Sequence, residues 1–378
     1  MAPTLSESMR TALASRARKS SLRTLSVVPP DSVDFSSNDF LSLSVSAALH
    51  GSFVENLRTG PLRLGSGGSR LLDGNSEYAT ALEATIASFH NAEVGCLFNS
   101  GFDANAGFFA CVPQPGDVIV YDAAIHASVH EGMRQSRAGV RAPFEHNDVG
   151  DLERVLQKAV AEDAQVKRGE RNVFVAVESL YSMDGDVAPL KEIVEVVERV
   201  LPAGNGKIIV DEAHSTAIIL CSPLTKEYLI NYARPLIYTT FMSYPSLVAI
   251  RTVYDLMMSG GTAAAAAHLW KLVVHLHTRL LALPHCPTNP ILRIPKQCPQ
   301  SPIFALLTPQ PRSLARTCQE AGYVVRAIVA PTVPLGMERV RVCLHAGNSL
   351  AEVEALVGII RKWVQTGGSR SVKHKAKI

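Results

Sequence analysis

Short apolar segments alternate with helical repeats between residues 77 and 225, and this alternation restricts the possible folds more than any other feature. Strand-like runs at 95–99, 118–121, 173–177 and 208–210 are almost entirely apolar. The segments between them repeat apolar residues at helical spacing, as after Pro189, which suits the first turn of a helix. Strands that are apolar throughout are typical of parallel sheets with helices on both faces. The sequence therefore predicts an α/β fold with a large, mostly parallel sheet.

The pattern changes after residue 245. Two long helices are predicted at about 246–258 and 264–282, followed by a proline-rich stretch, short strands and a final helix at about 351–366. This order is typical of a smaller α+β domain. We therefore predict four regions, which are an N-terminal helix and arm (1–45), a large sheet domain (46–245), a small C-terminal domain (246–368) and a basic tail (369–378).

Composition excludes several classes of protein. The net charge of +3 is too small to indicate a nucleic-acid partner, and no apolar window is long enough for a membrane span. The seven cysteines form no CxxC pair, which argues against a structural zinc site or a disulfide framework and for a reducing compartment. The N-terminus lacks the apolar core of a secretory signal, so we predict a polar leading helix, although its Arg and Ser content also suits a mitochondrial presequence.

The basic C-terminal residues allow two interpretations. A polar tail after Gly367 and Gly368 is typical of a solvated terminus. The last three residues, Ala376-Lys377-Ile378, also resemble the small-basic-aliphatic signal that a peroxisomal receptor reads at a free carboxyl end. The sequence therefore leaves two locations open, the cytoplasm and the peroxisome.

Four loops that follow predicted strands carry the candidate chemistry, because open α/β sheets bind ligands at the carboxyl ends of their strands. The first, NSGFDAN at 99–105, has a glycine turn before a helix, whose free N–H groups suit a phosphate, but such turns also simply begin helices. The second holds His126, and a single histidine in such a loop is more often a hydrogen-bonded residue than a functional one. The third, at 178–186, has acidic side chains that could bind a metal. It is more simply a turn before the next helix, and we predict no metal site.

The fourth loop begins with Asp211 and contains Glu212 and His214. An acid at the end of a strand, facing a cofactor pocket, can keep a pyridine nitrogen protonated and so make the ring an electron sink. Each of the four signals is modest by itself. Their order along the chain matches one family.

In this order the motifs resemble those of the α-oxoamine synthases, pyridoxal-phosphate enzymes with the aspartate-aminotransferase fold (fold type I). The resemblance covers about residues 10 to 365 and is greatest to the biotin-pathway member. It rests on eight motifs, which are FSSNDFLSL (35–43), GSGGSR (65–70), NSGF (99–102), IHAS (125–128), YSMDGD (181–186), VDEAHST (210–216), LIYTT (236–240) and APTVP (330–334).

The resemblance implies a role for each candidate site residue. His126 would stack on the pyridine ring, Asp211 would pair with its nitrogen, and His214 would complete the catalytic set. Pyridoxal 5'-phosphate would also be held by Gly101 and Phe102 at its phosphate, by Ser182 and His214 near its 3-hydroxyl, and by Thr239 and Thr240 of a neighbouring subunit. The substrate-side positions are Arg23, Asn38, Thr332 and Arg341, the last of which would bind the amino-acid carboxylate.

The resemblance also implies the reaction and the partners. An acyl-CoA of the pimeloyl-CoA type would condense with a small amino acid, alanine first, and decarboxylation would give an amino ketone. The shared phosphate contact implies a homodimer with active sites built from both subunits.

One segment of the family's pattern is absent. Family members carry several dozen residues between the motif that ends at Thr216 and the apolar run that begins at Ala217, including a core strand and the lysine that binds the cofactor covalently. Here the motif runs directly into the apolar segment. The nearest lysines, Lys207 and Lys226, lie at the wrong end of a strand and in a later helix. We therefore predict an internal deletion near 216–217 that leaves the neighbouring strands unpaired.

The deletion leaves two classes of function open. The first is an acyltransferase whose complete chain contains the segment, this form being a splice or gene-model variant. The second is a non-catalytic partner subunit without the lysine. A clean excision favours the first class, because a pseudoenzyme usually substitutes the lysine and keeps its strand.

Overall fold

The computed structural model describes residues 3–19, 21–25, 27–61, 63–212, 217–283 and 291–368. His214 and the C-terminal tripeptide, on which two of the predictions depend, lie outside these residues. The elements in chain order are α1 (Leu5–Arg18), β1 (Val33–Asp34), η1 (Leu43–Val45), α2 (Ala47–Thr59), α3 (Glu77–Phe89), β2 (Val94–Leu97), α4 (Gly101–Cys111), β3 (Val118–Asp122), α5 (Ala127–Gln135), β4 (Val140–Phe144), α6 (Val149–Glu162), α7 (Ala164–Lys167), β5 (Val173–Glu178), α8 (Leu190–Val200), β6 (Gly206–Asp211), β7 (Ile218–Cys221), α9 (Pro223–Tyr232), α10 (Arg234–Tyr238), α11 (Tyr244–Met258), α12 (Ala263–Leu281), β8 (Ile303–Leu307), α13 (Pro311–Glu320), β9 (Tyr323–Val324), β10 (Arg326–Ile328), β11 (Arg339–Cys343) and α14 (Leu350–Gln365).

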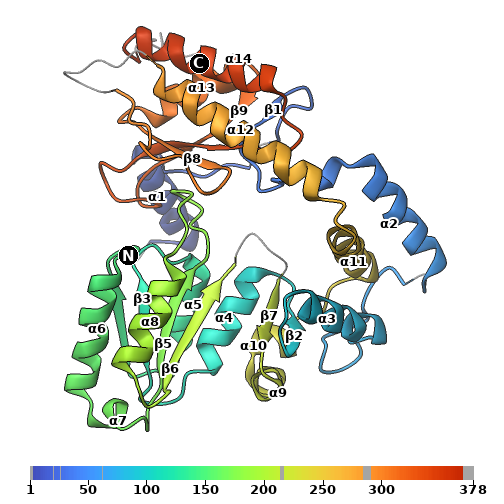
Figure 1. The fold of residues 1–378 in the computed structure, drawn as a ribbon, viewed down its shortest axis with the longest axis vertical. Helices are drawn as coiled ribbons and strands as arrows, with labels where there is room; N and C mark the ends of the chain where they lie inside the picture. Colours follow the sequence, from blue (N-terminus) through green and yellow to red (C-terminus); the bar gives the residue numbers. More distant parts are fainter. Residues whose placement is uncertain are drawn as a thin grey trace.

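Four parallel strands form the main sheet, in the order β4-β3-β5-β6 (Figure 1). At its centre Val175 of β5 lies opposite Val120 of β3 and Ile208 of β6. Every residue of β5 is buried, because helices cover both faces of the sheet. The valines of β5 pack with α6 and α8, while Phe174 and Ala176 pack with α4 and α5. The predicted α/β fold class is therefore confirmed.

Two further strands, β2 and β7, form a separate antiparallel pair. Their register places Cys96 opposite Ile219. Within the described parts of the chain, β6 pairs only with β5, and β7 pairs only with β2. All four residues of β7 are half-buried, and Val210 of β6 is 37% exposed. The strands on either side of the predicted deletion thus each have one unpaired edge.

The C-terminal part packs around its own core. An antiparallel sheet, in the order β10-β11-β8, packs with α12, α13 and α14 around residues such as Leu276, Leu306 and Trp363. Phe35 of the N-terminal arm belongs to the same core, and β1 pairs in parallel with β9. Helix α11 instead packs against α2 and α3. The predicted domain limits stay a prediction.

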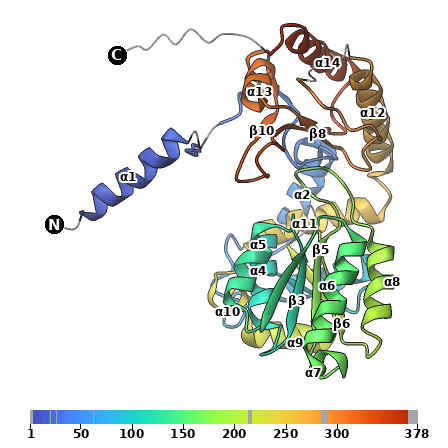
Figure 2. The same cartoon turned by 90° about the vertical axis from the view of Figure 1, so that its left-hand side faces the viewer.

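Helix α1 projects from the rest of the chain (Figure 2) and has no buried residue. Thr4 and Glu7 form a reciprocal capping box at its N-terminus, so the helix is capped locally. The predicted polar leading helix is confirmed. None of the helices in the described ranges is both long and apolar enough to cross a bilayer.

Candidate active site

The end of β6 carries a hydrogen-bonded network of four side chains. Asp211 is the last residue of β6, and its Oδ2 accepts a hydrogen bond of 2.7 Å from Nδ2 of Asn105 in α4. The same amide nitrogen donates to Oγ of Ser128 at 3.0 Å. Ser128 Oγ in turn lies 2.8 Å from Nδ1 of His126, the residue that caps α5. The network therefore links two predicted site residues, Asp211 and His126, through Asn105 and Ser128.

Burial governs the charge at this end of the sheet. It raises the pKa of Asp211, while the hydrogen bond from Asn105 and the charge of His126 act to lower it. Glu178 lies opposite Asp211 in β5, and burial together with the Asp211 charge raises the pKa of Glu178 to about 8. At neutral pH Glu178 therefore keeps its proton. The hydrogen bond from Asn105 favours the charged form of Asp211.

Helix α4 begins beside this network. Its N-cap, Ser100, accepts a hydrogen bond of 3.0 Å from the backbone N–H of Asp103. Gly101 and Phe102 are exposed, and a Cβ added at Gly101 would meet no atom within 4 Å. The Phe102 ring meets the His126 ring edge-on, with the centroids 6.5 Å apart. The free N–H groups and positive dipole end of α4 thus have open space next to His126.

Arg341 reaches from β11 to the turn that follows β5. Its two terminal nitrogens donate to the carbonyl oxygens of Ser182, at 3.3 Å, and Ser36, at 3.2 Å. Its Nε is buried and has no hydrogen-bond partner among the residues described. A guanidinium that is held in place and still has a donor to satisfy is suited to bind a carboxylate.

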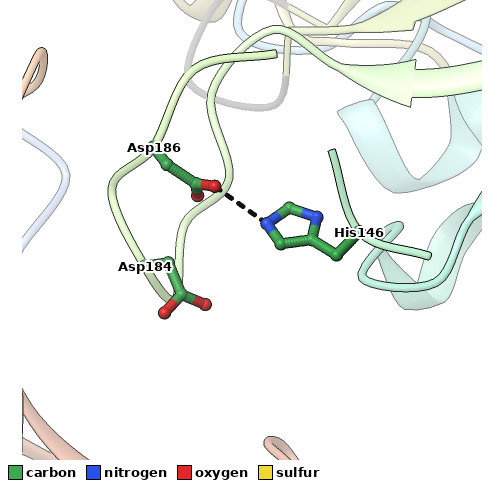
Figure 3. A group of neighbouring side chains, drawn as sticks. All are labelled: His146, Asp184 and Asp186. Atoms are coloured by element: carbon green, nitrogen blue, oxygen red, sulfur yellow. Dashed lines mark hydrogen bonds and ion pairs between the residues drawn. The ribbon is translucent and has the colours of Figure 1, made fainter. Parts of the chain in front are cut away.

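The turn that contains Ser182 is anchored by charged side chains. Nε2 of His146 lies 2.9 Å from Asp186 (Figure 3). Nδ1 of the same ring lies 2.8 Å from Asp122. Asp184, in the same turn, pairs with the buried Arg339 of β11. His146, Asp184 and Asp186 are close enough together to hold a metal ion, but the carboxylates already use both ring nitrogens of His146. The cluster is therefore explained as an internal ion network that fixes the turn.

We expect this network to stabilise the protein less at alkaline pH. Burial lowers the pKa of His146, but the hydrogen bonds and charges of Asp122 and Asp186 outweigh it and raise the pKa to about 10. Because an unfolded histidine has a pKa of about 6.5, the stabilisation is complete below that pH and is lost as the pH rises to about 10. His146→Gln should cost about 2 kcal/mol of unfolding free energy at pH ~6.5 and much less at pH ~10.5, measured by urea unfolding. Equal losses at both pH values would contradict this.

The other predicted residues do not join the Asp211 network. Arg23, Asn38 and Thr332 are exposed. Thr239 and Thr240 follow α10 and are also exposed. The carbonyl oxygen of Thr240 accepts a hydrogen bond of 2.6 Å from Asn99, just before the start of α4. His214 lies outside the described residues, and the roles of all these residues stay predictions.

Comparison with known proteins identifies the family. The family described as aminotransferase class I and II matches residues 30–219 of this chain. The chain belongs to this family. It is 48% identical to an 8-amino-7-oxononanoate synthase of Emericella nidulans, over 99% of this chain and 98% of the relative. It is 34% identical to the aminoacyl transferase sphA of Aspergillus fumigatus, over 87% of this chain and 80% of the relative.

A solved structure shows the same fold. It is a serine palmitoyltransferase from S. paucimobilis, a lysine-to-alanine variant with bound PLP and myriocin, which matches with a TM-score of 0.79 and 20% identity over 97% of this chain and 100% of that chain. The predicted family and fold type I are thus confirmed, and pyridoxal 5'-phosphate is the cofactor of this aminotransferase family. The alignment with the Emericella nidulans synthase runs over 411 positions against 378 residues here, so at least 33 positions have no residue in this chain.

The described residues fit the non-covalent contacts of the aminotransferase-family cofactor. A buried carboxylate suits the pyridine nitrogen, an imidazole suits the ring, and the start of α4 suits the phosphate. The covalent contact has no counterpart at these positions. Lys226 Nζ lies 2.8 Å from Glu83 Oε2, and Lys207 Nζ donates to the carbonyl oxygen of Gly204 at the opposite end of β6 from Asp211.

Asn105 is the member of the network that lies outside the eight family motifs. A signal for it exists in the sequence, because Asn105 follows Gly101 by four residues and one helical turn places both on the same face of α4. Nothing in the sequence alone shows that this face meets the end of β6. That contact depends on how α4 packs on the sheet.

Proposed function

We propose that this chain is a pyridoxal-phosphate-dependent acyltransferase that condenses an acyl-CoA with a small amino acid. The observation that carries the proposal is the hydrogen bond from Asn105 to Asp211, which holds one buried carboxylate at the end of β6, linked through Ser128 to His126. The family and its acyltransferase relatives support the same reaction class.

Each side chain has a separate task in this proposal. Asp211 keeps a proton on the pyridine nitrogen, and Asn105 orients the carboxylate that does so. His126 covers the ring, while the N–H groups at the start of α4 bind the phosphate. Arg341 binds and orients the carboxylate of the amino acid. When bound, pyridoxal phosphate supplies an electron sink for negative charge on the α-carbon of that amino acid.

The substrates follow from the name of the 48%-identical relative. Its product, 8-amino-7-oxononanoate, is a nine-carbon acid with an amine beside a ketone. A seven-carbon pimeloyl group joined to the two carbons that remain of decarboxylated alanine gives this skeleton. We therefore place pimeloyl-CoA and alanine first, in a biotin-pathway reaction, with glycine and serine as the alternatives that pocket size would select.

Subunit sharing is part of the proposal. Thr239 and Thr240 are exposed. The carbonyl oxygen of Thr240 accepts a hydrogen bond from Asn99, just before α4. This position suits a contact with the phosphate in a second copy of the chain. A homodimer with shared active sites is therefore the proposed assembly.

A non-catalytic partner subunit is the second candidate. It is favoured by the lysines, because the amines of Lys207 and Lys226 are both engaged away from Asp211. In this case the chain would bind a catalytic homologue and perform no condensation itself.

One experiment separates the two candidates. In a restored chain, the segment that the Emericella nidulans synthase has in addition would be inserted between Thr216 and Ala217. Release of free CoA from pimeloyl-CoA would be measured with alanine, glycine and serine, for the restored chain and for the chain without the insert. We expect CoA release from the restored chain only. A restored chain that binds pyridoxal phosphate but releases no CoA with any of the three amino acids would overturn the acyltransferase proposal.

In the restored chain, Arg341→Ala should raise the KM for the amino acid by roughly 10- to 150-fold. This corresponds to the loss of a charge-assisted hydrogen-bond pair, worth about 1.5–3 kcal/mol. Initial rates at varied alanine would give the effect, with the exposed Arg316→Ala as a control for lost positive charge. An unchanged KM would remove Arg341 from the substrate site.

The chain without the insert should form no covalent link to the cofactor. Because the amines of Lys207 and Lys226 are paired elsewhere, borohydride treatment with pyridoxal phosphate present should leave no cofactor mass on any tryptic peptide. The restored chain is the positive control. A modified Lys207 or Lys226 peptide would show that one of these residues substitutes for the missing lysine.

A further inference from the structure

Strand β6 has a backbone edge that faces away from its only described partner. The carbonyl oxygens of Asn205 and Asp211 accept hydrogen bonds from Val173 and Ser179 on the β5 side. Because the N–H and C=O groups of a strand alternate between its two sides, positions 207 and 209 also face β5. Gly206, Ile208 and Val210 therefore direct their backbone donors and acceptors to the free edge.

The surroundings of this edge are apolar. Ile208 packs with the core under α6 and α8, while Ile209 packs with the core under α4. Ile219 of β7 packs against that same α4 core, so β6 and β7 border one layer of the molecule (Figure 1). A strand placed between them would need apolar side chains on both faces, as β5 has.

Strands β6 and β7 are both incompletely covered by the described residues. Every residue of β5 is buried, whereas in β6 only Asp211 is, and no residue of β7 is. At least 33 positions of the alignment with the Emericella nidulans synthase have no residue in this chain, a total larger than one strand of about 5–6 residues. The missing cover has the polarity of one β-strand that is buried on both faces.

We infer that the free edge of β6 is a binding site for one extended apolar peptide strand supplied by another polypeptide. The occupant is an extended strand with apolar side chains on both faces, as its surroundings require, and the segment inserted in the restored chain, presented as a separate peptide, is the probe for it. The occupant binds by adding its backbone to Gly206, Ile208 and Val210 and by packing its side chains between α4 and α8. This inference requires the sheet alone and no catalytic step, so it can hold or fail independently of the proposed function.

The test uses the full chain and a fluorescent synthetic peptide of that segment. Binding is followed by fluorescence anisotropy, and amide exchange is resolved residue by residue along β6. We expect saturable binding and new protection of the amides of Gly206, Ile208 and Val210. The amides of Lys207 and Ile209 already face β5 and should change little. Uniform protection of the β6 amides, or none, would overturn the inference, because strand addition protects alternate amides only.

Two controls isolate the backbone contact. Two peptides are N-methylated at alternate residues, one at the odd positions and one at the even positions. Each keeps its side chains but loses the N–H donors on one side of the strand. The peptide that has lost the donors facing β6 should bind about tenfold more weakly than the other. On the protein, Val210→Pro removes an edge N–H and should weaken binding by about tenfold or more, while Val210→Thr keeps it and should bind normally. Equal binding of both N-methylated peptides would overturn the inference even if Val210→Pro fails to fold. Edge protection that rises with protein concentration without peptide would make a second copy the occupant and overturn it as well.

Discussion

Asp211→Asn in the restored chain is expected to lower kcat on the order of 100-fold or more, with little change in the KM for acyl-CoA. An amide cannot provide the negative charge that keeps the pyridine nitrogen protonated, so the electron sink is weakened in the step that needs it. The acyl-CoA does not contact Asp211 in our proposal, which is why its KM should be spared. Steady-state kinetics with pimeloyl-CoA and alanine measure both constants.

Glu212→Gln is the matched control for this prediction. Glu212 is the next residue and is exposed, and its charge raises the pKa of Asp211 only as a minor influence. The control should therefore keep kcat within about twofold. If both variants lost activity equally, the effect would come from general charge at the end of β6 and not from a specific contact of Asp211.

Glu83→Gln is expected to reduce the free energy of unfolding by about 3–5 kcal/mol, the cost of leaving buried charges without their partner. The Glu83 side chain is 2% exposed and accepts hydrogen bonds from Arg70, from Lys226 Nζ at 2.8 Å and from the backbone N–H of Leu97 at 2.7 Å. A neutral amide would leave two cations near the core of α3 and β2 without a counter-charge. Urea unfolding at neutral pH gives the loss.

Glu55→Gln provides the comparison for Glu83. Glu55 pairs with Arg58 on the exposed surface of α2, so its loss should cost about 0–1 kcal/mol. A similarly small loss for Glu83→Gln would mean that Arg70 and Lys226 reach solvent in the variant. Lys226 would then no longer be held by Glu83, and the expectation that it forms no cofactor adduct would need a new test in that variant.

The sequence predicted the elements whose pattern is local. The run at 173–177 is apolar throughout because both of its faces are covered, and β5 is buried at every residue. The polar leading helix was predicted from an N-terminus without an apolar core, and α1 has no buried residue. The turn with Ser182 and the strand end with Asp211 were recognisable because the family places its motifs at the ends of strands.

Contacts between segments that are distant in sequence could not be predicted from local patterns. Glu83 reads as one polar residue in an amphipathic helix, and only the approach of α9 and the loop with Arg70 explains its burial. The role of Asn105 likewise depends on the packing of α4 near the end of β6, which brings its amide within hydrogen-bond distance of Asp211. Phe35 belongs to the C-terminal core although it is close to the N-terminus, since the arm joins β9 through β1. These placements depend on packing between segments distant in sequence.

The split of the sheet has a consequence for cooperativity. On one face, strands β2 and β7 share a small core with α3 and α11, while on the other face Cys96 and Ile219 pack with the α4 core that also contains residues of β3, β5 and β6. In the described residues no strand hydrogen bonds join the two groups. We therefore expect the smaller group to unfold at a lower urea concentration than the main sheet, in a transition of its own. A bridging strand, inserted or bound, would merge the two transitions and turn two neighbouring folding units into one.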